Sequence, residues 1–181
     1  MGTRKYKLTD ETITVVRNGK EVTLHRIEAL RDFADVKAGD LGGFVESEAN
    51  LSHDGNCWVY DTAKVYGDAK IFGNAWICGS AKVYGDAKIF GNALVYDNAE
   101  VYGFAEVHGC AKVSNNAEVY DNTDVYDNAR IFGNALVYDN AEVYGKAWVY
   151  GETEVFGNAW VYGSAVVYGM DKVCGDTELS T

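Results

Sequence analysis

The stretch VYDTAKVYGDAKIFGNAWICGSAKVYGDAKIFGNAL, residues 59–94, contains six consecutive copies of one six-residue unit. The unit continues without a slip to Glu178 and occurs 20 times in all. Position 1 is Val or Ile and position 3 is Gly, Asp or Asn in every copy, while position 2 is Tyr or Phe in 16 and position 5 is Ala in 16. A short fixed period of this kind predicts a solenoid, in which each repeat packs on its neighbours.

Alternation of side chains along a strand gives each position a direction. From position 5 to position 2 of the next copy the order is Ala, a variable residue, Val or Ile, then an aromatic residue. Ala and Val therefore share one face, and we expect them to point inward because their size hardly varies. Positions 3 and 4 supply corners with tight backbone. Three strands and three corners make a triangular coil of 18 residues, and the repeat makes about seven coils.

Stacked coils place corner residues above one another at a spacing of roughly 4.8 Å, so the rod is on the order of 30 Å long. We expect side-chain ladders such as Asn74–Asn92 and Asn98–Asn116–Asn134.

An aliphatic residue followed four residues later by a small one resembles the unit of the hexapeptide-repeat left-handed β-helix superfamily. The resemblance implies left-handed winding, an exception to the usual right-handed crossover. The segment KAGDLGGFVESEANLSHDGNCWVYD, residues 37–61, is similar to the start of bacterial hexapeptide proteins labelled acyltransferases or transferases. The expected fold is thus all-β: a left-handed parallel β-helix with an N-terminal hairpin cap.

The chain divides into two parts. Residues 1–44 do not follow the period and form the predicted cap, with a β-hairpin around Asn18-Gly19 and a lead-in segment. Residues 45–181 form the predicted hexapeptide-repeat solenoid, beginning with one irregular coil that contains Val45, Leu51 and Trp58–Tyr60. We expect the hairpin to cover the first coil, since an open solenoid end invites polymerisation.

Composition narrows the function classes. The formal charge of −11 disfavours binding to nucleic acid or to anionic membrane, although it permits an acidic surface that imitates DNA, an alternative weakened by the lysines of the early coils. Four cysteines without CxxC spacing predict neither a metal site nor a disulfide framework. The polar N-terminal sequence shows no signal peptide or membrane-spanning run, so the expected compartment is the cytoplasm.

The repeat assigns every outward residue to one of three sides. The first side carries Lys64, Tyr66, Lys82, Tyr84, Glu100, Tyr102, Glu118, Tyr120, Leu136, Tyr138, Glu154 and Phe156. The second side carries Lys70, Phe72, Lys88, Phe90, Glu106, His108, Asp124, Tyr126, Glu142, Tyr144, Trp160 and Tyr162. The third side carries Trp58, Tyr60, Trp76, Cys78, Leu94, Tyr96, Lys112, Ser114, Arg130, Phe132, Trp148, Tyr150, Val166 and Tyr168.

The third side differs from the other two. It holds three of the four tryptophans and no acidic outward residue. Such an apolar surface is typical of an interface, and Trp, Tyr and Arg are the residue types that anchor interfaces. We expect protomers to meet here, as a homotrimer like many hexapeptide proteins; the alternative is a plain stack of rings along an exposed sheet. The expected interface residues are Trp58, Tyr60, Trp76, Leu94, Tyr96, Lys112, Arg130, Phe132, Trp148, Tyr150, Val166 and Tyr168.

Catalytic candidates are few. The resemblance implies a histidine base near a subunit boundary and a loop that shapes the acceptor pocket, but no insertion breaks residues 59–178. The patch that departs from the repeat in several positions comprises Phe104, His108, Cys110, Ser114 and Asn115. His108, with Glu106 beside it to orient the imidazole, and His53 are the candidates for a base. The alternative is drift in one coil, with His108 replacing a tyrosine.

Two functions follow from these observations. The leading hypothesis is a non-catalytic oligomeric solenoid, a scaffold or sequestering protein that binds a small ligand or a protein partner through its surface or the clefts between subunits, without a cofactor. The alternative is an O- or N-acyltransferase that uses acyl-CoA at a trimer boundary.

Overall fold

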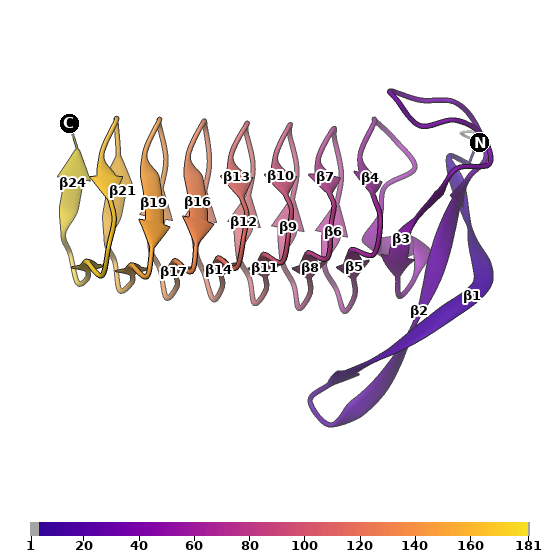
Figure 1. The fold of residues 1–181 in the computed structure, drawn as a ribbon, viewed down its shortest axis with the longest axis horizontal. Coiled ribbons are helices and arrows are strands. Elements are labelled where there is room, and N and C mark those ends of the chain that lie inside the picture. Colours follow the sequence, from indigo (N-terminus) through magenta and orange to yellow (C-terminus); the bar gives the residue numbers. More distant parts are fainter. Residues whose placement is uncertain (1–3, 181) are drawn as a thin grey trace.

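The computed structural model describes residues 4–180 and shows a long rod with a hairpin at its N-terminal end (Figure 1). The described part of the chain is all-β apart from one 3-10 helix, η1 (Glu48–Asn50). The rod is a parallel β-solenoid of about eight coils, in which each strand pairs with the strand 18 residues later, as Leu94 pairs with Lys112. The predicted fold class is confirmed, and the left-handed winding stays a prediction from the resemblance.

Three parallel sheets form the three sides of the rod. The first side contains β3 (Leu41–Val45), β5 (Lys64–Val65), β8 (Lys82–Val83), β11 (Glu100–Val101), β14 (Glu118–Val119), β17 (Leu136–Val137), β20 (Glu154–Val155) and β23 (Lys172–Val173). The second side contains β6 (Lys70–Ile71), β9 (Lys88–Ile89), β12 (Glu106–Val107), β15 (Asp124–Val125), β18 (Glu142–Val143), β21 (Trp160–Tyr162) and β24 (Glu178–Ser180). The third side contains β4 (Trp58–Val59), β7 (Trp76–Ile77), β10 (Leu94–Val95), β13 (Lys112–Val113), β16 (Arg130–Gly133), β19 (Trp148–Gly151) and β22 (Val166–Val167).

The core is a stack of small and branched aliphatic side chains. Ala93, Val95, Ala111 and Val113 are buried, as are their equivalents along nearly the whole rod. The inward direction predicted for positions 1 and 5 is therefore correct. Each layer is thin, so a coil has apolar neighbours only in the coils before and after it.

The corners follow from the residue type at position 3. This residue has a positive φ in every copy, whether it is Gly, Asp or Asn. At Gly91 (φ 69°) a Cβ would lie 2.9 Å from the backbone nitrogen of Gly109 in the next coil. Asp and Asn tolerate the same conformation and use their side chains to bond the next coil, as Asp139 Oδ2 accepts from the Gly157 N–H at 3.1 Å.

The predicted side-chain ladders are present. Asn74 donates to Asn92 at 3.1 Å, Asn98 to Asn116 at 3.3 Å, and Asn116 to Asn134 at 3.0 Å. Rings stack in the same way on the first and second sides, as Tyr102 on Tyr120 with centroids 4.9 Å apart. These ladders tie each coil to the next outside the core.

The cap is an antiparallel hairpin of β1 (Tyr6–Arg17) and β2 (Lys20–Ala29), joined at Asn18-Gly19, both with positive φ. β2 pairs antiparallel with β3, and β3 pairs parallel with β5. The hairpin therefore occupies the free edge of the first sheet, as predicted. Because β3 belongs to the first coil, the solenoid begins a few residues before residue 45.

Candidate functional site

The third side exposes large apolar side chains along most of its length. Trp76 is 36% exposed, Trp148 41%, Val166 50% and Tyr168 57%. No residue of its two outward columns is acidic. An exposed row of this kind is typical of a binding surface.

Trp58 does not lie on that exposed surface. It is 1% exposed, because the cap covers it: the Phe33 ring lies 5.3 Å away and the Tyr6 ring 6.1 Å, both edge-on. Its assignment to an interface between protomers is therefore wrong. The repeat predicted the side correctly, but the repeat carries no information on what the non-repetitive cap covers.

Two cations lie side by side in the middle of the third side. Lys112 and Arg130 are register partners on β13 and β16. Within residues 4–180 neither forms an ion pair, whereas on the other sides Lys82 contacts Glu100 at 2.6 Å and Lys88 contacts Glu106 at 2.7 Å. The Arg130 guanidinium lies over the Trp148 ring, 5.3 Å from its centroid. These two side chains therefore give the middle of the third side a positive charge.

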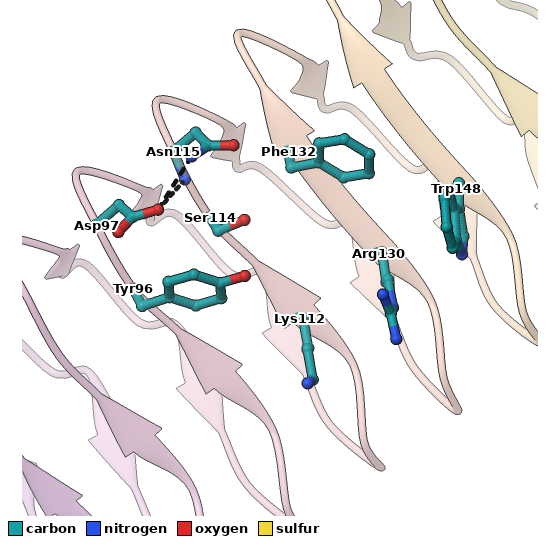
Figure 2. A pocket seen from close by; sticks show the side chains of 8 residues that line it. All are labelled: Tyr96, Asp97, Lys112, Ser114, Asn115, Arg130, Phe132 and Trp148. Carbon is teal, nitrogen blue, oxygen red and sulfur yellow. Dashed lines mark hydrogen bonds between the residues drawn. The ribbon is translucent and has the colours of Figure 1, made fainter.

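A hollow of about 270 Å³ opens beside these cations (Figure 2). Ser114 stands in it where most coils carry a ring, and Tyr96 and Phe132 lie on either side (Figure 2). Asp97 and Asn115 occupy the corner, where Asp97 Oδ2 accepts from the Asn115 Nδ2 at 3.0 Å. The complete lining is Tyr96, Asp97, Lys112, Ser114, Asn115, Arg130, Phe132 and Trp148.

His108 lies on the second side as one rung of a ring ladder. Its imidazole stacks between Phe90 at 4.6 Å and Tyr126 at 5.2 Å. Its Nε2 is 3.1 Å from Asp124 Oδ1. The carboxylate nearest the ring nitrogen is thus Asp124; the predicted partner Glu106 is instead paired with Lys88.

The sequence contained the signal for this pairing. In this solenoid the ring at position 2 reaches the carboxylate 16 residues later, as Tyr84 reaches Glu100 and Tyr102 reaches Glu118. The same offset from His108 gives Asp124. Asp124 lies on the adjacent strand of the next coil, whereas Glu106 precedes His108 in the same coil. Side chains on adjacent strands lie close enough to contact one another, so Asp124 is the carboxylate that contacts the ring.

Burial raises the pKa of the Asp124 carboxyl above its ordinary value; His108 lowers it, and the carboxylates of Glu106 and Glu142 raise it further. An aspartate carboxyl in the unfolded chain has a pKa of about 3.9. Between this pKa and the higher pKa in the folded chain, the folded chain binds more protons than the unfolded chain. The contribution of Asp124 to the free energy of unfolding therefore falls as the pH rises through this range. We expect Asp124→Asn to remove this fall, which urea denaturation from about pH 4 to pH 7 measures. If the urea midpoints of the wild type and the variant differed by the same amount at every pH, the pH dependence would not come from Asp124.

The other histidines are held by the cap. His53 stacks on Tyr6 at 4.4 Å, and its Nδ1 accepts from the Lys5 N–H at 3.2 Å. Its Nε2 is 3.7 Å from Glu48. His25 contacts the Thr9 carbonyl at 3.3 Å. The structure does not bring His53 and His108 together, since they lie in different coils.

The remaining irregular residues do not converge on one site. Phe104 is 64% exposed at a corner, and Cys110 is exposed at another. Ser114 and Asn115 belong to the hollow on the third side. Within residues 4–180 no three His, Cys, Asp or Glu side chains gather as a metal site would require. No helix in that range has the length and apolarity needed to span a bilayer.

Comparison with known proteins gives a partial match. Part of the chain is similar to part of a bacterial protein named as an acetyltransferase. It is 42% identical over 73 residues to a protein named uncharacterized acetyltransferase YdcK, from Escherichia coli (strain K12). The match covers 38% of this chain and 22% of the relative, so the chain spans about a fifth of that protein's length. No family model matches the chain. The fold and this match agree with the resemblance to hexapeptide-repeat proteins.

Proposed function

We propose that the protein is a non-catalytic binding scaffold whose copies assemble through the third side, with a trimer as the favoured form. The observation that carries this proposal is the concentration of exposed Trp76, Trp148, Val166 and Tyr168 on a side with no acidic outward residue. On the other sides carboxylates stand in the same column. Removal of this apolar row from water favours association.

Charge favours the same surface for contact between copies. Each chain carries a formal charge of −11, so two copies repel one another over most of their surface. The third side is where this repulsion is weakest, because Lys112 and Arg130 are its outward charges. Clefts between assembled copies would be open to a small ligand or a protein partner. Four free cysteines suit the cytoplasm as the place of action.

The test is the mass of the native particle in solution. The wild type is expected to sediment as a multiple of 19.8 kDa. The double variant Trp76→Glu/Val166→Glu is expected to sediment as a single chain at the same concentration, because two carboxylates would be buried without partners at each contact. Both positions are exposed in the single chain, so its fold is expected to remain.

The matched control is Trp160→Glu. Trp160 is 41% exposed, as Trp148 is, but it lies on the second side. This variant is expected to keep the mass of the wild type. Equal dissociation by Trp160→Glu, or a double variant that stays assembled, would contradict assembly through the third side.

The match to YdcK favours a second candidate, an acyltransferase that uses acyl-CoA. His108 would be its general base, held by Asp124 at 3.1 Å, and the site would lie where two copies meet. Calorimetric titration with acetyl-CoA separates the two functions. Saturable binding, together with an acetyl transfer that His108→Ala abolishes, would favour the enzyme; no binding by the assembled protein would favour the scaffold.

A further inference from the structure

The ring ladder of the third side is interrupted, unlike those of the other two sides. On the first and second sides successive rings stack nearly parallel with centroids 4.6 to 5.2 Å apart. On the third side the equivalent column has Cys78 and Ser114 in place of rings. Stacking resumes only at Phe132 and Tyr150, with centroids 4.7 Å apart.

One ring is missing from the column at Ser114, a buried residue that lies between two rings. Tyr96 and Phe132 belong to the coils before and after it, so their strands are separated by two rungs, about 9.6 Å. The hollow between them measures about 270 Å³, which is below the roughly 300–1,000 Å³ of pockets for drug-sized ligands. Phe132 and Trp148, which both line the hollow, meet edge-on with centroids 6.1 Å apart. The small volume and the two flanking rings therefore favour a ligand of one ring.

The charges beside this gap select for an anion. Lys112 and Arg130 line the hollow, and within the described chain neither is paired with a carboxylate. The acid at the rim, Asp97, is engaged: its Oδ2 accepts from both the backbone N–H and the side-chain amide of Asn115, at 3.2 and 3.0 Å. Two adjacent cations repel each other, and an anion between them relieves this repulsion.

We propose that this hollow binds a small aromatic anion, a single planar ring that carries a carboxylate or a phosphate. The ring takes the missing rung between Tyr96 and Phe132, and the anionic group contacts Lys112 and Arg130. The proposal adds a ligand class to the proposed binding function, and it rests on the third side being the surface that binds. The hollow itself is built within one chain.

The second gap of the same column provides a comparison inside the molecule. At Cys78 the outward residues in the places of Lys112 and Arg130 are the uncharged Trp76 and Leu94. The Tyr60 ring also leans edge-on toward Trp76, with centroids 5.5 Å apart. A missing ring without cations is expected not to bind the anion.

The experiment titrates benzoate and phenyl phosphate into the Trp76→Glu/Val166→Glu chain, followed by NMR at the Ser114 amide. In that variant no second copy covers the hollow. At least one of the two probes is expected to bind about ten-fold or more tightly than cyclohexanecarboxylate, which has the charge but not the planar ring, because ring stacking contributes roughly 1–3 kcal/mol. The ratio of the two probes distinguishes a carboxylate from a phosphate ligand.

Substitutions locate the site. Ser114→Tyr restores the ring of the repeat and is expected to weaken binding at least about ten-fold while the chain stays folded; Cys78→Tyr fills the other gap and is expected to leave binding unchanged. Lys112→Gln and Arg130→Gln are each expected to weaken it. Equal binding of the planar and saturated acids, or no loss in Ser114→Tyr, would overturn the proposal.

The two proposals fail separately. A wild type that sediments as a single chain and binds the aromatic anion would refute the assembly and keep this site. A wild type that assembles, while neither it nor the dissociated variant binds either probe, would refute the site and keep the assembly.

Discussion

Val107→Asp is expected to prevent the rod from folding. Val107 is fully buried in β12, between Ile89 and Val125 of the neighbouring coils. A carboxylate there loses the apolar contacts, about 1.5–3 kcal/mol, and its burial costs several kcal/mol more. The sum is comparable to the whole stability of about 5–15 kcal/mol for a domain. Each coil is stable only when it packs on its neighbours. Loss of the packed core at Val107 therefore separates the coils before it from the coils after it.

Circular dichroism of the purified chain measures this effect. Val16→Asp makes the same substitution at a position of β1 that is 70% exposed, and is expected to change the urea midpoint little. A Val107→Asp chain with the spectrum and midpoint of the wild type would show that the stacked core is not what stabilises the rod.

Trp58→Ala is expected to release the cap from the rod. The indole is buried against Phe33 and Tyr6, and truncation of a buried aromatic residue costs about 3–5 kcal/mol. The loss falls on the junction between hairpin and first coil, so amide exchange is expected to speed up most in residues 5–36. Trp160→Ala, at a site 41% exposed, is expected to change stability by about 0.5 kcal/mol or less.

If Trp58→Ala and Trp160→Ala had the same denaturation midpoint, and the hairpin amides of both exchanged as in the wild type, Trp58 would not join the cap to the rod.

The repeat predicted most of the architecture because its geometry is local. Val95 points inward and Tyr96 outward by strand alternation alone, and the 18-residue coil then places Leu94 beside Lys112. The same arithmetic predicted the Asn98–Asn116 ladder. It fails where the chain does not repeat: the burial of Trp58 depends on Phe33, which no period relates to it.

The candidate site was predictable in part. The residues of the third side followed from the period, and so did the position of Ser114 in a column of rings. The partner of His108 was misassigned because Glu106 is nearer in sequence, whereas Asp124 is nearer in space across adjacent strands. The hollow at Ser114 was not predicted as a site, since it depends on Lys112 and Arg130 forming no ion pair within residues 4–180 while Asp97 at the rim bonds to Asn115, which only the structure shows.

The most direct test of the central claim is hydroxyl-radical footprinting of the tryptophans in the native particle. In the single chain Trp76, Trp148 and Trp160 are exposed to similar extents, 36%, 41% and 41%, so Trp160 on the second side is an internal reference. Assembly through the third side predicts that Trp76 and Trp148 are oxidised several-fold more slowly than Trp160, and that Trp76→Glu/Val166→Glu restores the oxidation of Trp148 to the rate of Trp160. Equal oxidation of all three in the wild type would contradict assembly through that side.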